Sequence, residues 1–290
     1  MENSKALFQR MIQQISLPES ADEIRSIVFL VLENLFGLSR EAVYAEKHLE
    51  VEVQQARRLT EIIERINQEE PVHYILGEAD FFARKFKVNP SVLIPRPETE
   101  ELVQCVLRSC KPPKVHPIRI LDIGTGSGCI AVTLALELSG AAIYATDISS
   151  EALLVAKENA AQLGASVQFL QHSILAGDIP FHDLDVLVSN PPYIARAEVE
   201  TMGKNVVAHE PHLALFVPDD DPLVFYRALA ERAKPVLKEG GLLVVEINER
   251  LGNEVAALFE AEGYGPVEII SDLSGKARIV KGVAHPISHK

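Results

Sequence analysis

The chain has 290 residues, of which 47% are hydrophobic and 24% charged, a composition typical of a folded globular protein. Its 28 basic and 41 acidic side chains leave a net charge of −13, which argues against a protein that binds mainly by covering nucleic-acid phosphates with cations. The three cysteines form no Cys-x-x-Cys pair, and no apolar run approaches the roughly 18 residues of a membrane-spanning helix. We therefore expect a cytoplasmic protein that is neither membrane-bound nor principally a nucleic-acid binder.

Residues 1–75 are predicted to form a small helical domain. Apolar residues recur at helical spacing over residues 24–35 and again over residues 59–66. Ser20 and Ser39 are placed to cap the helices that follow them. We read residues 76–97 as a β-hairpin linker, because two aromatic segments there flank charged residues and are followed by Asn89-Pro90. The Pro-rich segment Lys111–Pro117 further divides the chain.

Residues 98–290 are predicted to form an α/β domain in which strands alternate with helices. This alternation is typical of βαβ units and of a parallel sheet covered on both faces. The predicted helices are Glu98–Ser109, Ser127–Leu138, Ser149–Leu163 and Pro222–Leu237. The predicted strands are Arg119–Ile123, Ala142–Thr146, Val167–Leu170, Asp185–Ser189 and Leu242–Ile247, with Val267–Ile270 and Ala277–Lys281 as a hairpin-like edge.

The first strand of this domain runs into a glycine-rich loop. The loop consists of Gly124, Thr125, Gly126, Ser127 and Gly128. Glycines let the backbone approach a ligand closely, and the N-terminus of the following helix offers free N–H groups. Because Cys129 comes next, the third glycine falls one place early for the G-x-G-x-x-G dinucleotide fingerprint. The alternative is a tight turn with no ligand, but its place in a βαβ unit favours a ligand site.

The second strand ends in Asp147, where an acidic side chain can accept hydrogen bonds from both hydroxyls of a ribose. Asp147 and Ser149 also precede a helix, so a capping role is the alternative, and both roles can hold. A shortened glycine pattern with a ribose acid suggests a nucleoside ligand without a pyrophosphate. S-adenosyl-L-methionine fits this description, with its amino-carboxylate at the glycine loop and its ribose at Asp147.

A second motif follows the fourth strand. It consists of Asn190, Pro191, Pro192 and Tyr193. Prolines cannot pair in a ladder, so the chain leaves the sheet here, at the edge where the cofactor is expected. The Asn190 side chain and a proline carbonyl can accept hydrogen bonds from a substrate –NH₂, and the Tyr193 ring can cover a planar group. The alternative is a Pro-rich turn with a half-buried tyrosine.

These motifs together resemble the HemK/PrmC family of protein-(glutamine-N5) methyltransferases. The resemblance extends over roughly residues 20–282, and its most specific block is Ile94-Pro95-Arg96-Pro97-Glu98-Thr99-Glu100. It implies a class I methyltransferase fold with a seven-stranded, mostly parallel, Rossmann-like sheet. It also implies an N-terminal helical domain that recognises the substrate, a β-hairpin linker and catalysis of methyl transfer. The implied methyl donor is S-adenosyl-L-methionine, and the implied product is S-adenosyl-L-homocysteine.

The resemblance implies that the substrate is the glutamine of the Gly-Gly-Gln motif in class-1 peptide chain release factors. It assigns catalysis to Asn190, Pro191 and Tyr193, and substrate binding to these three residues together with Pro192. It assigns cofactor binding to the glycine loop, Asp147, Ile148, Ser173, Ile174 and Asn190. Two departures from the family pattern are Ala83, where a glycine is usual, and the segment Glu246–Arg250. We expect the protein to act as a monomer.

Three other functions are compatible with parts of the sequence. An adenine-N6 nucleic-acid methyltransferase uses the same Asn-Pro-Pro-Tyr chemistry on a flipped base, but the acidic charge argues against it. A nicotinamide-dependent oxidoreductase is disfavoured by Cys129. A non-catalytic scaffold is disfavoured by the intact Asn190 and Tyr193. No His or Cys cluster predicts a metal site.

Overall fold

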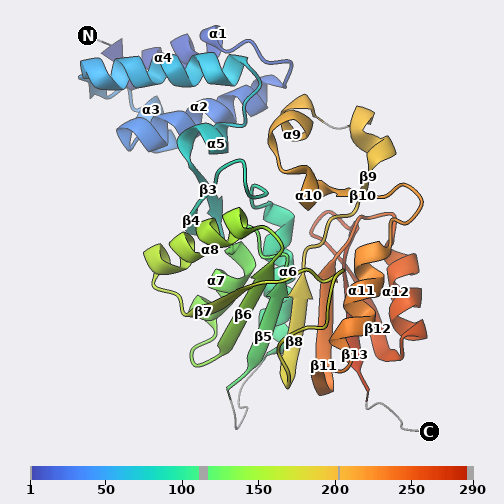
Figure 1. Ribbon diagram of the computed structural model, residues 1–290. Helices are drawn as coiled ribbons and strands as arrows, with labels where there is room; N and C mark the ends of the chain where they lie inside the picture. The colour runs from blue at the N-terminus through green and yellow to red at the C-terminus, as the bar shows by residue number, and fades with distance from the viewer. Residues whose placement is uncertain (1, 111–116, 202, 286–290) are drawn as a thin grey trace, which may run out of the picture. The chain divides into compact units, whose positions relative to one another are not determined.

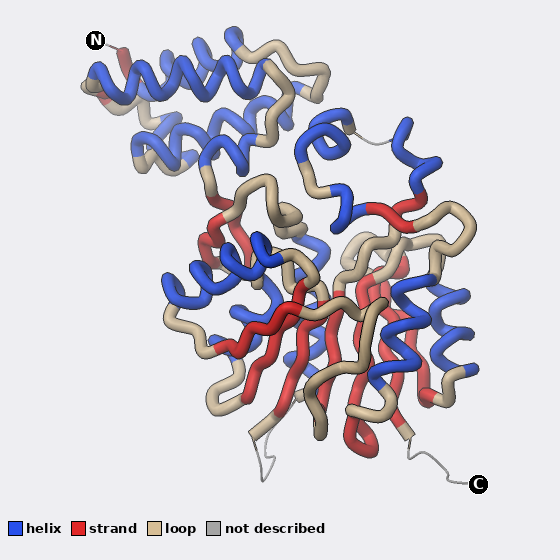
Figure 2. Tube along the Cα trace, viewed as in Figure 1, coloured by secondary structure: helices blue, strands red, loops and turns tan. Residues whose placement is uncertain are grey.

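The computed structural model describes residues 2–110, 117–201 and 203–285 (Figures 1 and 2). By the density of its internal contacts the chain divides into two compact units. The first comprises Met1–Glu78 together with Gly203–His209, and the second comprises Ala79–Met202 with Glu210–Lys290. Most of the Pro-rich segment predicted at Lys111–Pro117 lies outside the described residues.

The first unit is helical, as its apolar spacing predicts. Its helices are α1 (Ser4–Gln14), α2 (Ala21–Phe36), α3 (Arg40–Tyr44), α4 (Val53–Asn67), α5 (Val72–Leu76) and α9 (Lys204–His209), with a short pair of strands, β1 (Glu2–Asn3) and β2 (His48–Leu49). Ser20 and Ser39 cap α2 and α3 as predicted, each accepting a backbone N–H at 3.2 Å. The apolar stripes of α1, α2 and α4 meet in one core.

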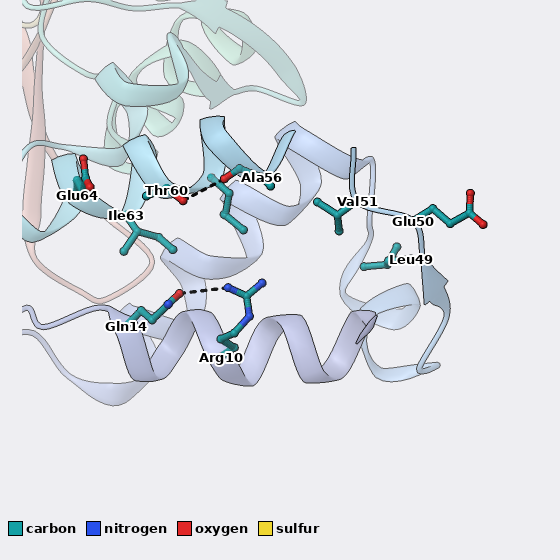
Figure 3. A pocket seen from close by; sticks show the side chains of 10 residues that line it. Arg10, Gln14, Leu49, Glu50, Val51, Ala56, Thr60, Ile63 and Glu64 are labelled. Atoms are coloured by element: carbon teal, nitrogen blue, oxygen red, sulfur yellow. Dashed lines mark hydrogen bonds between the residues drawn. The ribbon is translucent and has the colours of Figure 1, made fainter. Parts of the chain in front are cut away.

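A cavity of about 850 Å³ lies in this unit between α1 and α4 (Figure 3). Arg10 and Gln14 of α1 line one side and are hydrogen-bonded at 3.5 Å. Thr60 and Ile63 of α4 line the other side, and residues 49–51 close one end. None of the residues predicted for the chemical site lines this cavity.

The predicted hairpin is formed by β3 (Glu78–Phe81) and β4 (Arg84–Lys87). Its turn residues Phe82 and Ala83 both have a left-handed backbone, with φ of 50° and 57°. This is the conformation that glycine adopts most easily, which explains why a glycine suits position 83. The backbone N–H of Phe82 donates to Glu100 Oε1 at 2.8 Å, so the first turn of the following helix holds the hairpin.

The second unit contains a seven-stranded sheet with the order β12-β13-β11-β8-β5-β6-β7. The strands are β5 (Arg119–Ile123), β6 (Ala142–Asp147), β7 (Val167–Gln171), β8 (Leu184–Ser189), β11 (Leu237–Glu246), β12 (Tyr264–Ser271) and β13 (Ala277–Ala284). All pairs are parallel except those made by β13, which lies antiparallel between β11 and β12. The order reverses at β5, with β6 on one side and β8 on the other. This is the predicted mostly parallel fold.

Helices cover both faces of the sheet (Figure 1). Helices α6 (Pro97–Ser109), α7 (Cys129–Glu137) and α8 (Ser150–Leu163) pack on one face, and α11 (Val224–Ala233) and α12 (Gly252–Ala261) on the other. Alternation along β5 supplies both cores: Ile120 packs with the first group and Leu121 with the second. The sheet is therefore buried on both sides, as continuous apolar strands require.

Several elements differ from the prediction. Helix α11 ends at Ala233 rather than Leu237, because Pro235 cannot continue it and Leu237 already belongs to β11. Helix α12 was not predicted. Between residues 194 and 217, the part that the structure describes forms only short elements: β9 (Ile194–Ala195), η1 (Arg196–Thr201), α10 (His212–Leu215) and β10 (Phe216–Val217), besides α9. Within the described residues, no helix combines the length and apolar character needed to cross a membrane.

Candidate active site

A cavity of about 330 Å³ opens at the carboxyl ends of β5, β6 and β8. This is the edge where the strand order reverses, which is the usual ligand site of an open α/β sheet. Among the predicted site residues, those that line it are Gly124, Gly126, Asp147, Ile148, Ser173, Ile174, Asn190, Pro191 and Pro192. Residues that lie far apart in the sequence therefore line the same cavity.

The glycine loop is held against the end of β6. The N–H groups of Gly124 and Thr125 both donate to the carbonyl of Thr146 at 2.9 Å. Gly126 lines the cavity with φ of 54°, and a Cβ placed there would have no atom within 4 Å. The space beside the Gly126 backbone is therefore open, and we call it the cradle. A ligand can approach the backbone closely there because glycine has no side chain to fill that space.

The other loop residues shape the loop rather than line the cavity. Thr125 and Ser127 are buried and do not belong to the cavity wall, contrary to the expectation that the whole loop contacts the ligand. Gly128 has φ of 81°, and a Cβ there would lie 3.0 Å from Cβ of Ala156. The third glycine therefore allows α7 to pack against α8.

Asp147 connects the end of β6 to this loop. Its Oδ2 accepts the N–H of Gly126 and its Oδ1 accepts the N–H of Ser149, each at 2.9 Å. Ser149 itself caps α8 by accepting the N–H of Ala152 at 3.1 Å, which is the capping role expected for it. Burial raises the pKa of Asp147, and the hydrogen bonds from Ser149 and Gly126 oppose that rise. Each oxygen keeps lone pairs for a ligand hydroxyl.

Asp122, at the carboxyl end of β5, was not predicted as a site residue. Its Oδ2 accepts the hydroxyl of Thr125 at 2.6 Å, and its Oδ1 has no partner among the residues that the structure describes. Complete burial raises the pKa of this carboxyl to about 7. A buried oxygen without a partner directly beneath the glycine loop is costly, and such groups cluster at functional sites. The sequence signal for Asp122 was its position two residues before Gly124, where the glycine loop begins.

Asn190, Pro191 and Pro192 line the cavity after β8, the strand next to β5 from which the glycine loop continues. Asn190 Nδ2 donates to Thr99 Oγ1 at 3.2 Å. Its Oδ1 accepts no hydrogen bond within the described part of the chain, so a free carbonyl oxygen is available at the cavity. An amide carbonyl held this way can accept a hydrogen bond from a ligand –NH₂.

Tyr193, whose ring is expected to cover the substrate, is not among the residues that line the cavity. The ring is mostly buried against the core below β11, and burial raises the pKa of its hydroxyl. Its hydroxyl interacts electrostatically with the buried Glu246, and each group influences the pKa of the other. The chain turns at the two prolines, and the ring packs with the core rather than toward the cavity.

The remaining wall contains residues that sequence reasoning missed. His172, Val92, Leu93, Leu213 and Phe225 line the cavity beside Ser173 and Ile174. The segments 91–93 and 211–214 are joined by Glu210, which is 3% exposed. Its Oε1 accepts Arg96 Nη2 at 2.6 Å, and its Oε2 accepts the N–H of Ile94 at 3.4 Å. The available sequence signal was that the Ile94–Pro97 block and Glu210-Pro211 both contribute to the family resemblance although they lie outside the predicted sheet.

Taken together, the cavity presents a ribose-type acceptor at Asp147 and a free amide carbonyl at Asn190. It also has an apolar wall at Ile148 and Ile174 that suits a planar base. Within the residues that the structure covers, no group of three His, Cys, Asp or Glu side chains could hold a metal ion. Such an arrangement can hold a nucleoside at one end and a small –NH₂ group at the other.

Two family models match the chain. The PrmC N-terminal domain matches residues 7–77, and the Methyltransferase small domain matches residues 101–213. Among solved structures, a methyltransferase from Pyrococcus furiosus is 19% identical, with a TM-score of 0.51 over 77% of this chain and 98% of that chain. This likeness supports the class I methyltransferase fold that the strand order indicates.

Full-length relatives are closer in sequence. A release factor glutamine methyltransferase from Bacteroides thetaiotaomicron is 40% identical over 97% of this chain and 99% of its own length. A protein of the same description from Flavobacterium psychrophilum is 37% identical over 94% of this chain and 96% of its own. These relatives do not favour the adenine-N6 alternative.

Proposed function

We propose that this chain, which belongs to the release factor glutamine methyltransferase family, methylates the side-chain amide nitrogen (N5) of a glutamine in peptide chain release factors. The methyl donor is S-adenosyl-L-methionine, and the target is the glutamine of the Gly-Gly-Gln motif of class-1 release factors. The observation that carries the proposal is one cavity lined by both Asp147 and Asn190. A ribose acceptor and an amide acceptor thus face the same space.

The residues present fit this cofactor. The cradle above Gly126 accommodates a closely approaching group, and Asp147 retains lone pairs for the two ribose hydroxyls. Ile148, Ser173 and Ile174 line the adjoining wall, where the adenine is proposed to bind. When bound, S-adenosyl-L-methionine supplies a methyl group made electrophilic by its sulfonium.

The protein's contribution to the reaction is orientation. An amide nitrogen is a weak nucleophile because its lone pair is delocalised into the carbonyl. Asn190 Oδ1 and the carbonyl of Pro191 are proposed to accept the two N–H groups of the glutamine, which aims the nitrogen at the methyl group. Orientation of this kind contributes about 7–11 kcal/mol in well-organised cases. The same two acceptors stabilise the positive charge that develops on nitrogen.

No strong base is required at the nitrogen. An N-alkylated, protonated amide is very acidic, so its proton can pass to water. Asn190 is flanked in the cavity lining by Ser189, Pro191 and Pro192, none of which is a strong base. Tyr193 then acts from beneath the wall, through Glu246, rather than by covering the substrate.

The domain roles follow the same proposal. The helical unit up to Glu78 is proposed to recognise the release factor, the hairpin of β3 and β4 to link it, and the sheet unit to perform methyl transfer. We further propose that the protein is a monomer and that it acts in the cytoplasm, because its proposed substrate is a translation factor.

The test is methyl transfer with an isotopically labelled cofactor. The full-length protein is incubated separately with a class-1 release factor, with the same factor carrying Gly-Gly-Asn in place of Gly-Gly-Gln, and with duplex DNA. We expect label only on the unmodified release factor, at the glutamine identified by peptide mass spectrometry. Label on the DNA, or equal label on the Gly-Gly-Asn factor, would contradict the proposal.

A further inference from the structure

The side chain of Asn190 can serve the proposed reaction in only one of its two amide orientations. With Oδ1 toward the substrate it accepts a hydrogen bond from the glutamine –NH₂, whereas with Nδ2 toward the substrate two donors oppose each other. The two orientations have nearly the same shape, so packing alone does not choose between them. A hydrogen-bonding partner on the other side must do so.

We propose that Thr99 and Glu246 are positioning residues that hold the Asn190 amide with its carbonyl oxygen toward the substrate. This inference rests on the proposed function. Thr99 belongs to the Ile-Pro-Arg-Pro-Glu-Thr-Glu block, and Glu246 directly precedes Ile247 and the residues 248–250 that depart from the family pattern. Neither residue lines the cavity, so both act through Asn190.

The three side chains form a continuous relay. Asn190 Nδ2 lies 3.2 Å from Thr99 Oγ1, and Thr99 Oγ1 lies 2.8 Å from Glu246 Oε2. A threonine hydroxyl has one hydrogen and two lone pairs. A carboxylate only accepts, so Thr99 donates its hydrogen to Glu246 and must accept from Asn190. The negative charge of Glu246 therefore makes Thr99 an acceptor toward Asn190. As a result, the Nδ2 end of the Asn190 amide faces Thr99 and the Oδ1 end faces away from it.

The relay is built from three separate elements that the fold brings together. Thr99 lies in the first turn of α6, Glu246 at the end of β11, and Asn190 directly after β8. β8 and β11 are paired in parallel with Val245 opposite Ser189, so Glu246 and Asn190 are the next residues in register. Thr99 and Glu246 are 3% and 1% exposed. The hydrogen bond between Thr99 and Glu246 is thus shielded from water, which strengthens it.

Glu246 also joins the two ends of the Asn-Pro-Pro-Tyr motif. Its side chain interacts with Thr99, which holds Asn190, and with the hydroxyl of Tyr193. Its backbone carbonyl accepts the hydroxyl of Tyr226 at 3.2 Å. One buried carboxylate therefore supports both functional side chains of the motif from below the cavity wall.

The protonation state of Glu246 provides a specific signature of this role. The titratable side chains that face it are Glu98 of α6, Cys129 of α7, Tyr193 after β8, Tyr226 of α11 and Arg278 of β13. Burial raises the pKa of Glu246 to about 7, while the Thr99 hydrogen bond, Arg278 and Tyr193 oppose the rise. A protonated Glu246 becomes a donor to Thr99 and no longer enforces the orientation. Turnover at saturating cofactor should therefore fall as pH is lowered through about 7.

The first test compares Thr99→Val, which has the same shape without the hydroxyl, with Thr99→Ser, which restores it. Thr133→Val is the matched control, because Thr133 is a fully buried threonine in α7 outside the relay. We expect Thr99→Val to lower kcat roughly 10- to 100-fold at a temperature where it is folded, with cofactor Kd within about twofold. Thr99→Ser should recover most of this loss, and Thr133→Val should show none.

The second test uses the pH profile and a readout that needs no turnover. Glu246→Gln cannot ionise, so its kcat should lose the acidic limb with midpoint near 7 that the wild type shows. In ¹⁵N-labelled protein, the Asn190 side-chain amide signals, assigned by their absence from Asn190→Ala, should titrate over the same range in the wild type but not in Glu246→Gln.

Three outcomes would overturn the inference. One is a Thr99→Val enzyme with wild-type kcat. Another is a parallel loss of kcat, cofactor affinity and thermal stability that Thr99→Ser does not recover, which indicates a structural role only. The third is an Asn190 amide signal that does not respond to pH or to Thr99→Val. If the wild type fails to methylate a release factor, the proposed function fails, but the amide signals still decide whether Thr99 and Glu246 orient Asn190.

Discussion

Asp147 Oδ2 accepts the backbone N–H of Gly126 at 2.9 Å, and this hydrogen bond ties the carboxyl end of β6 to the glycine loop after β5. The acidic side chain therefore has two functions in the same place. It fixes the loop that forms the cradle, and it offers its remaining lone pairs to the ligand that lies in it. Cofactor affinity should depend on both.

Asp147→Ala should weaken binding of S-adenosyl-L-methionine at least tenfold. The substitution removes two ribose acceptors, each worth about 1.5–3 kcal/mol when charged, and frees the N–H of Gly126. Titration calorimetry measures the change, with circular dichroism to confirm folding. Asp178→Ala, at an exposed aspartate in the loop after β7, is the matched control and should bind normally. Unchanged affinity in folded Asp147→Ala would exclude the ribose assignment.

The stability of the ligand-free protein should carry a pH dependence from Asp122. Burial raises its pKa from 3.8 to about 7, so the folded state holds a proton that the unfolded state releases. This contribution to stability is complete below the unfolded pKa of 3.8 and is lost as pH rises through about 7.

Asp122→Asn cannot ionise, so its free energy of unfolding should fall less steeply over this pH range. The difference in slope should be at most about 1.4 kcal/mol per pH unit. Urea unfolding at a series of pH values measures both slopes, with exposed Asp178→Asn as the control. Equal slopes for Asp122→Asn and wild type would show that the buried carboxyl does not titrate as described.

Ala83→Gly should stabilise the protein. Ala83 is exposed and has φ of 57° in the turn between β3 and β4, a backbone that costs an alanine roughly 1–2 kcal/mol. Glycine adopts it freely but loses more entropy on folding, so we expect a net gain of about 0.5–1 kcal/mol. Ala161→Gly, on the exposed side of α8, should destabilise by about 1 kcal/mol. Denaturant unfolding of both variants should therefore give changes of opposite sign; a loss in Ala83→Gly would contradict the turn geometry.

A chain that begins at Gly77 should still bind the cofactor but methylate release factor poorly. The cavity is built wholly from residues 91–229, whereas the helical unit has its own apolar core. Residues 203–209 group with that helical unit, so we expect them to lose order on truncation while the cavity persists. Titration calorimetry measures cofactor binding by the truncated chain, and labelled methyl transfer measures its activity on release factor. Full activity of the truncated chain on intact release factor would contradict a recognition role for the helices.

The regular part of the fold could be predicted from the sequence because local signals determine it. β5 runs from Arg119 to Ile123 as predicted, since its apolar run is bounded by Pro117 and Gly124. Helix α12 could not be predicted in the same way. It begins at Gly252 without a side-chain cap, and its fully buried apolar residues are only Val255 and Phe259, which pack on β12 and β13. Tertiary packing rather than local sequence stabilises it.

The site could be predicted where its residues lie in contiguous motifs, but not where they are joined over long distances. The glycine loop and Asn190 follow strands, so the topology of a parallel sheet places them at one edge. The hydrogen bond between Thr99 and Glu246 connects residues 147 positions apart, and no periodicity connects them. The inward position of Tyr193 could not be predicted for the same reason. Glu246, the buried residue with which its hydroxyl interacts, lies far away in the sequence at the end of β11.

The central claim is that Asn190 acts on the substrate amide. Its most direct test is the turnover of Asn190→Ala on a class-1 release factor, measured with labelled cofactor beside a cofactor titration and a thermal melt. We predict a loss of roughly 10²–10³ in kcat, with cofactor affinity within about twofold of wild type and a folded protein. Turnover close to wild type in a folded Asn190→Ala protein would contradict the account.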